Sequence, residues 1–146
     1  MMRWCRRLCA GALLGWCVGV MASLPVTAQT ASEQMSEYLM FSDFQAGIIS
    51  PQQIEPDIFE KLVFIDTRQG EAFAQNTIPG AIHIEWREVL ERQDEIPTDR
   101  KVVLFCNTGV LSAQAMFALR VNGFVNVLVL QSGFDGSLKH HNSGSE

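Results

Sequence analysis

The segment over residues 101–115 constrains the fold of this chain more than any other. After a lysine it has four apolar residues in a row, 102–105, which is typical of a strand that is covered on both faces. It leads into residues 112–119, which are rich in good helix formers. The short loop between them begins with Cys106 and contains Gly109, which can adopt a backbone conformation that other residues resist. The segment therefore predicts a buried strand, a tight loop and a helix.

The position of Cys106 in this segment has a chemical consequence. A cysteine at the carboxyl end of a parallel strand faces the unsatisfied backbone N–H groups of the helix that follows. These donors favour an anion, so they favour the thiolate over the thiol and lower the cysteine pKa. They can also hold an anionic substrate or an extra sulfur atom on the cysteine. The alternative is that Cys106 is a small buried hydrophobic residue, as free cysteines often are.

The N-terminal residues have the pattern of a secretory signal peptide. Three arginines and no acidic residue precede an uncharged run over residues 8–24, and Pro25 is followed by small residues up to a cleavage point after Ala28. We therefore expect residues 1–28 to be removed on export to the periplasm. The alternative is an uncleaved N-terminal segment that anchors the protein to the membrane.

Cleavage at this point would leave 118 of the 146 residues, which is enough for one domain with a single core. It would also remove Cys5, Cys9 and Cys17, so that Cys106 has no partner for an internal disulfide and is a candidate reactive thiol. The remaining chain has eight basic residues against 16 acidic ones, a net charge of −8. That charge argues against nucleic acid and an anionic membrane surface as partners. We expect an N-terminal arm over residues 29–45, one domain over 46–136 and a flexible tail over 137–146.

Short apolar segments alternate with helical ones along the domain. Beside the central strand, the sequence predicts strands over residues 46–49, 61–66, 81–84 and 125–130, a weak helix over 29–42, a helical turn over 70–75 and an amphipathic helix over 86–92. This alternation indicates βαβ units and therefore an α/β fold with a parallel sheet. Ligands bind such sheets beyond the carboxyl ends of the strands, where both Cys106 and the segment 66–68 are expected.

Five motifs resemble, in order and spacing, those of the rhodanese domain, a sulfurtransferase fold. They are Ile49-Ser50-Pro51 at the start, Ile65-Asp66-Thr67-Arg68 at a strand end, the turn and strand of residues 78–84, the cysteine loop of residues 106–112, and the closing segment 123–127 with Leu130 and Gly133. The resemblance covers residues 48–135 and is narrowed by the predicted signal peptide to the small single-domain periplasmic rhodaneses of the phage-shock type. It implies a three-layer α/β domain with a central parallel sheet and helices on both faces.

The resemblance also implies a reaction. Cys106 would be the nucleophile that takes sulfane sulfur from thiosulfate, a polysulfide or a persulfide, holds it as a persulfide, and passes it to a thiol or to cyanide. The backbone of the loop would bind the substrate, which involves residues Asn107, Thr108, Gly109, Val110, Leu111 and Ser112. Asp66 and Arg68 would support this loop, with an ordinary structural ion pair as the alternative. Neither a cofactor nor a metal is implied.

The loop departs from the family pattern at one point. Active rhodaneses usually carry an arginine there, but the candidate positions here are Asn107, Val110 and Leu111. A charge-assisted hydrogen bond contributes about 1.5–3 kcal/mol, so its loss would weaken thiosulfate affinity by about 10- to 100-fold. We therefore expect weak thiosulfate activity and a less charged donor, such as a polysulfide or the persulfide of a protein partner.

Two other functions stay open at this point. The missing arginine is compatible with a non-catalytic module that binds a protein partner, and Cys106 is compatible with redox sensing through a mixed disulfide. A phosphatase of the cysteine–x5–arginine kind is excluded because Ser112 stands at the arginine position. We expect His83 to be a structural histidine and Trp86 to be a core or rim residue.

Overall fold

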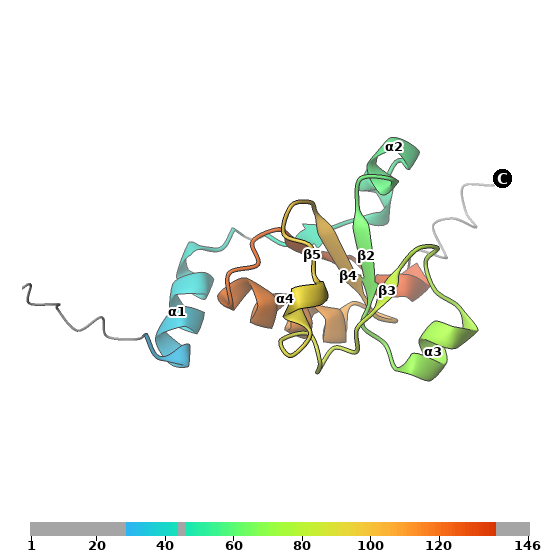
Figure 1. Ribbon diagram of the computed structural model, residues 1–146. Helices are drawn as coiled ribbons and strands as arrows, with labels where there is room; N and C mark the ends of the chain where they lie inside the picture. Colours follow the sequence, from blue (N-terminus) through green and yellow to red (C-terminus); the bar gives the residue numbers. More distant parts are fainter. Residues whose placement is uncertain (1–28, 44–45, 137–146) are drawn as a thin grey trace, which may run out of the picture.

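The computed structural model describes residues 29–43 and 46–136 (Figure 1). The expected signal peptide and the expected tail lie outside the described residues, so both stay predictions. The helices and strands, in chain order, are α1 (Ala31–Phe41), β1 (Ile48–Ile49), η1 (Pro51–Gln53), α2 (Pro56–Phe59), β2 (Val63–Asp66), α3 (Gly70–Gln75), β3 (Ile82–His83), η2 (Gln93–Glu95), β4 (Val102–Phe105), α4 (Val110–Val121) and β5 (Val127–Leu130), where η marks a 3-10 helix. None of the helices in the described ranges is long and apolar enough to cross a membrane.

The five strands form one parallel sheet in the order β1-β5-β4-β2-β3. Strand β4 lies in the middle, with Leu104 opposite Ile65 of β2 on one side and opposite Val129 of β5 on the other. All four residues of β4 are buried, as its unbroken apolar run predicts. The carboxyl ends of β2, β3 and β4 therefore meet at one edge of the sheet, where the loops that follow them come together.

The side chains of β4 alternate between two hydrophobic cores, one on each face of the sheet. Val102 and Leu104 pack with Ala115 and Leu119 of α4 in one core. Val103 and Phe105 belong to the other core, on the opposite face. Both faces are thus covered, which confirms the predicted α/β class with a central parallel sheet.

The second face is covered by short segments rather than by a long helix. Phe59 of α2 stacks on Phe64 of β2 with ring centroids 4.8 Å apart, and Phe134 stacks on Phe105 at 5.9 Å. On the first face, the N-terminal helix α1 packs against α4. The ring of Tyr38 in α1 contacts that of Phe117 in α4 edge-on, with ring centroids 5.3 Å apart. Helix α1 itself has no buried residue, which agrees with its weak sequence signal.

The amphipathic helix predicted over residues 86–92 is wrong. This segment forms a series of turns that leads into η2. The backbone N–H of Trp86 donates to the carbonyl oxygen of Thr67, beyond the end of β2, at 3.1 Å, so the start of the segment is tied to the sheet. Val89 is the one buried apolar residue of this segment, while Leu90 is 45% exposed. A single buried residue is too narrow an apolar face to pack a helix against the core.

The loop after β5 packs closely against the cysteine loop. The N–H of Phe134 donates to the carbonyl oxygen of Cys106 at 2.8 Å, and that of Asp135 to the carbonyl oxygen of Asn107 at 3.0 Å. Gly133 makes this approach feasible, because a Cβ atom there would lie 2.5 Å from the carbonyl oxygens of both Cys106 and Asn107. Its φ of +61° is also a conformation that favours glycine.

We expect Gly133→Ala to lower the free energy of unfolding by about 2–5 kcal/mol, since it combines backbone strain with a steric clash. The matched control is Gly123→Ala, which has a φ of +98° but no atom within 4 Å of the added Cβ, and it should cost about 1 kcal/mol. Urea unfolding of both variants measures the difference. Equal losses would contradict the close packing of the two loops.

Candidate active site

Cys106 directly follows β4 and opens the loop that leads into α4. Its sulfur accepts a hydrogen bond from the backbone N–H of Gly109 at 3.2 Å, and the hydroxyl oxygen of Ser112 lies 3.6 Å from it. Gly109 has a φ of +94° and is the N-cap of α4, which turns the chain sharply back over the sulfur. The sulfur of Cys106 therefore lies beside the N–H groups at the N-terminus of a helix of 12 residues.

The loop stabilises the ionised form of this sulfur. Burial raises the pKa of the Cys106 thiol, because it removes the charged form from water. The hydrogen bonds from the backbone N–H and hydroxyl of Ser112, and from the backbone N–H groups of Thr108 and Gly109, outweigh burial and lower the pKa below its ordinary value. At neutral pH, a larger fraction of Cys106 is thus thiolate than in an exposed cysteine.

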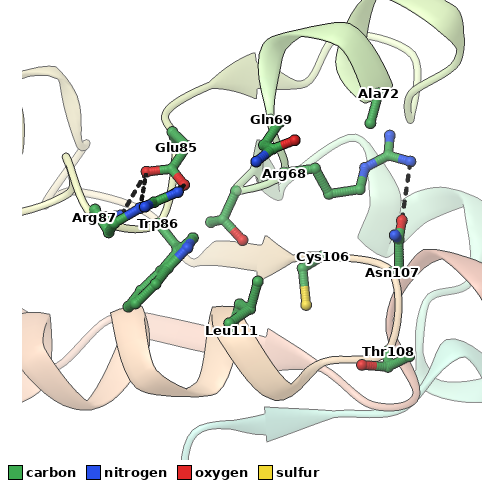
Figure 2. A pocket seen from close by; sticks show the side chains of 11 residues that line it. Arg68, Gln69, Ala72, Glu85, Trp86, Arg87, Cys106, Asn107, Thr108 and Leu111 are labelled. Atoms are coloured by element: carbon green, nitrogen blue, oxygen red, sulfur yellow. Dashed lines mark hydrogen bonds and ion pairs between the residues drawn. The ribbon is translucent and has the colours of Figure 1, made fainter.

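Cys106 is only 3% exposed, yet it lines a pocket of about 380 Å³. Figure 2 shows the Cys106 side chain among the lining residues, between those of Leu111 and Thr108. The lining residues come from three loops at the carboxyl ends of the strands: Thr67, Arg68, Gln69 and Ala72 after β2, Glu85, Trp86 and Arg87 after β3, and Cys106, Asn107, Thr108 and Leu111 after β4. A small molecule in the pocket can therefore reach the sulfur, although the residue itself is almost entirely buried.

The loop residues predicted to bind substrate fall into three groups, and Thr108 belongs to the first two. The backbone N–H groups of Thr108, Gly109 and Ser112 act on the sulfur of Cys106. Asn107 and Leu111 line the pocket, with Leu111 38% exposed. Val110 does not line it and is 63% exposed on the surface beside it.

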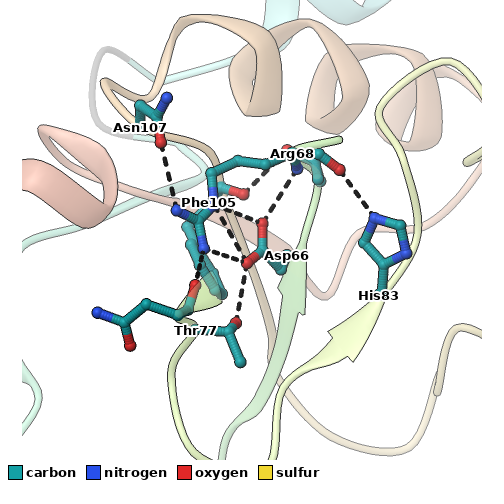
Figure 3. A network of polar contacts seen from close by, with 8 residues as sticks. Asp66, Arg68, Thr77, His83, Phe105 and Asn107 are labelled. Atoms are coloured by element: carbon teal, nitrogen blue, oxygen red, sulfur yellow. Dashed lines mark hydrogen bonds and ion pairs between the residues drawn. The ribbon is translucent and has the colours of Figure 1, made fainter. Parts of the chain in front are cut away.

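Asp66 and Arg68 form a buried ion pair behind the loop (Figure 3). Nη2 of Arg68 lies 2.6 Å from Oδ2 of Asp66, and its Nε lies 2.9 Å from Oδ1. Asp66 is fully buried and also accepts a hydrogen bond from the hydroxyl of Thr77 at 2.8 Å. Together these contacts fix the direction in which the arginine side chain leaves β2.

From this position Arg68 reaches the cysteine loop. Its Nη1 donates to the side-chain oxygen of Asn107 at 3.4 Å, and its guanidinium lies 4.4 Å from the ring centroid of Phe134. Nη2 also donates to the carbonyl oxygen of Asn76. Arg68 thus connects the buried carboxylate of Asp66 with both loops that surround Cys106, and four of its five N–H groups are used in doing so.

Sequence reasoning missed the third wall of the pocket. Glu85, Trp86 and Arg87 directly follow β3, whose carboxyl end lies at the same edge of the sheet as those of β2 and β4. That position is a signal for a pocket wall, but the interleaved charges over residues 86–92 favour an amphipathic helix instead. Trp86 is half-buried, packs against the core beneath α4 and faces the pocket. Arg87 brings a cation to the pocket that the cysteine loop does not contain.

The remaining titratable groups suggest no further centre. Nε2 of His83 lies 2.8 Å from the carbonyl oxygen of Arg68, and the imidazole stacks on Phe73 with centroids 4.8 Å apart, which is a structural role. Within residues 29–43 and 46–136, no group of three or more His, Cys, Asp and Glu side chains is arranged to hold a metal ion.

Comparison with known proteins agrees with this architecture. The model of the rhodanese-like domain matches residues 50–140. A sulfurtransferase of Allochromatium vinosum is 35% identical over 81 residues, which cover 56% of this chain and 76% of that protein. The thiosulfate sulfurtransferase GlpE of Pseudomonas syringae is 29% identical over 87 residues, which cover 60% of this chain and 82% of the relative.

Among solved structures, a rhodanese-related protein from Thermoplasma volcanium superposes with a TM-score of 0.59 at 20% identity. The match covers 64% of this chain and 91% of that one, and it supports the fold. The family model spans more than half of the chain, and the matched residues include all five strands of the sheet except β1. The chain therefore belongs to the rhodanese-like domain family.

Proposed function

We propose that this protein is a sulfurtransferase that carries sulfane sulfur on Cys106 as a persulfide. The observation that carries the proposal is the sulfur of Cys106, which faces a pocket and accepts a hydrogen bond from the N–H of Gly109 at 3.2 Å. The sulfurtransferase relatives support the same reaction class. A thiolate in such a site is a nucleophile, and the amides that stabilise it can stabilise a bound persulfide.

The proposed reaction has two steps. The Cys106 thiolate attacks the terminal sulfur of the donor, the sulfur–sulfur bond of the donor breaks, and the rest of the donor leaves with the electron pair, as sulfite from thiosulfate or as a thiolate from a persulfide. An acceptor thiolate or cyanide then attacks the outer sulfur of the Cys106 persulfide. The bond between the Cys106 sulfur and the outer sulfur breaks, and Cys106 returns as a thiolate. No external oxidant or reductant is therefore needed.

The charges around the pocket support a donor less charged than thiosulfate. The loop itself has no cation, and the charges of Arg68 and Arg87 are balanced by Asp66 and Glu85 at 2.6 Å and 2.9 Å. A dianion therefore meets no uncompensated positive charge there. An organic persulfide, whose sulfur atoms carry at most one charge, lowers this cost.

A second candidate function is a non-catalytic module that binds a protein partner. The observation that favours it is the exposure of two apolar residues beside the pocket, Val110 at 63% and Leu111 at 38%. The two functions differ in whether Cys106 gains and gives up sulfur, which the following experiment decides.

Treatment with thiosulfate or polysulfide should add the mass of one sulfur atom to the peptide that contains Cys106, and a thiol should then remove it. Peptide mass mapping localises the gain, and Cys106→Ser in the same chain should show none at this peptide. In protein that keeps residues 1–28, Cys5, Cys9 and Cys17 are unchanged between the two proteins and serve as an internal comparison. A Cys106 peptide that never gains sulfur rules out the sulfurtransferase and leaves the binding module.

Ser112→Ala should raise the pKa of the Cys106 thiol, because it removes a hydroxyl that stabilises the thiolate. Since the thiolate is the reactive form, the midpoint of the rate of alkylation by iodoacetamide should move to higher pH. At neutral pH the rate of alkylation should fall by about fivefold, which corresponds to the loss of about 1 kcal/mol, the typical net contribution of one hydrogen bond. Thr108→Ala is the control, because Thr108 acts through its backbone N–H, which the variant keeps. Identical pH profiles for all three proteins would contradict the role of Ser112.

Leu111→Arg should raise kcat/KM for thiosulfate by about tenfold, because it places a cation in the wall of the pocket. Val110→Arg adds the same charge at the neighbouring position, which does not line the pocket, and should have a much smaller effect. Steady-state assays of both variants with thiosulfate and cyanide test this. An equal gain from both would point to long-range charge, and no gain from either would mean that charge does not limit thiosulfate turnover.

A further inference from the structure

The pocket beside Cys106 is lined by two arginines, and they are held in different ways. Arg68 is 9% exposed, and four of its five N–H groups are bound by Asp66, Asn76 and Asn107. Its side chain runs toward Asn107, away from Trp86 and Arg87 (Figure 2). Because Asp66 neutralises it and the surrounding groups fix it, Arg68 has little capacity left for a ligand.

Within the described residues, the Arg87 guanidinium is hydrogen-bonded to one side chain, that of Glu85, and through one edge. Its Nη2 and Nε lie 2.9 Å and 3.1 Å from Oε1 of Glu85. Nη1 has no hydrogen-bond partner within the described part of the chain, and the side chain is 63% exposed. One edge of this arginine is therefore available to an anionic ligand while the pair with Glu85 stays in place.

Glu85 fixes the position of Arg87 and limits its charge. The Glu85 side chain is 14% exposed, and its Oε2 accepts a hydrogen bond from the backbone N–H of Arg87 at 3.0 Å. The hydrogen bonds from Arg87 lower the pKa of the Glu85 carboxyl, so it stays ionised at neutral pH. A ligand thus meets N–H donors of Arg87 that are fixed in position, while the Arg87–Glu85 pair as a whole has little net charge. Such a site suits a single carboxylate group better than a dianionic group.

Two apolar side chains lie between Arg87 and the reactive sulfur. In Figure 2, Trp86 and Leu111 lie between Arg87 and Cys106, and both line the pocket. The guanidinium of Arg87 lies 5.4 Å from the ring centroid of Trp86. A ligand that spans the pocket therefore needs a reactive sulfur at one end, a carbon chain against the Trp86 and Leu111 side chains, and an anionic group at the other end.

We propose that Arg87 binds the carboxylate of an organic persulfide donor whose carbon chain lies on Trp86 and Leu111. This inference rests on the proposed sulfur transfer at Cys106 and names the donor class for it. Cys106 attacks the outer sulfur of the donor, the donor's sulfur–sulfur bond breaks, and a carboxylate-bearing thiolate leaves and takes up a proton. Arg87 is thus a specificity residue that stands outside the loop in which the family usually places its cation.

The test varies the charge of the donor and of the residue together. The donors are persulfides of straight-chain mercaptocarboxylic acids and of the matching primary amides, and the acceptor is cyanide. Arg87→Gln should raise KM for the carboxylate donors by about fivefold, as expected for a half-exposed ion pair, with kcat little changed. For the amide donors KM should change little. Arg87→Lys should restore most of the loss, since it keeps the charge.

Arg100→Gln is the matched control, because Arg100 is 54% exposed, has an acidic neighbour in Asp99, and does not line the pocket. It should leave KM for both donors as in the unmodified protein. Equal effects of Arg87→Gln on acid and amide donors, or no effect on either, would overturn the inference while the transfer of sulfur to Cys106 stands. If no donor delivers sulfur to Cys106 in the unmodified protein, the proposed function fails together with the inference.

Discussion

The structure around the pocket depends on the hydrogen bonds that backbone N–H groups donate to one sulfur atom. Cys106 leaves the central strand of a parallel sheet, and Gly109, with a φ of +94°, turns the chain so that the amides before α4 face the sulfur. This arrangement uses no charged side chain. Its effect on the thiol persists because the amides are part of the backbone and the sulfur is shielded from water.

The loop keeps this geometry because two other segments hold it. Arg68 is positioned by the buried carboxylate of Asp66 and donates to Asn107, and the N–H groups of Phe134 and Asp135 donate to the carbonyl oxygens of Cys106 and Asn107. The role proposed for Asp66 and Arg68 is therefore support of the loop rather than contact with the donor. A buried ion pair costs desolvation, and here the hydrogen bonds to Thr77 and Asn76 offset that cost.

The central strand, the loop and the following helix could be predicted from the sequence because each has a local signal. The apolar run before Cys106 fixes the strand, and Gly109 and the helix formers after it fix the turn and α4. In these cases a residue type and its neighbours in the chain carry the information. The supporting role of Asp66 and Arg68 was implied by the family resemblance, with an ordinary ion pair as the alternative, and the structure pairs the two side chains behind the loop.

The wall formed by Glu85, Trp86 and Arg87 could not be predicted in the same way. The alternating charges after β3 have helical spacing, and only tertiary contacts, such as the bond from the Trp86 N–H to the carbonyl oxygen of Thr67, decide against a helix. The carbon chain and charge that a donor needs depend on this wall, so the sequence alone could not indicate them. The absence of an arginine in the loop was visible, whereas the presence of one across the pocket was not.

The most direct measurement is a crystal structure of the protein after treatment with polysulfide. We expect one additional sulfur atom bonded to the sulfur of Cys106, inside the pocket and within hydrogen-bond distance of the amides of the loop. A Cys106 that remains unmodified, or a bound sulfur atom that points away from these amides, would contradict it.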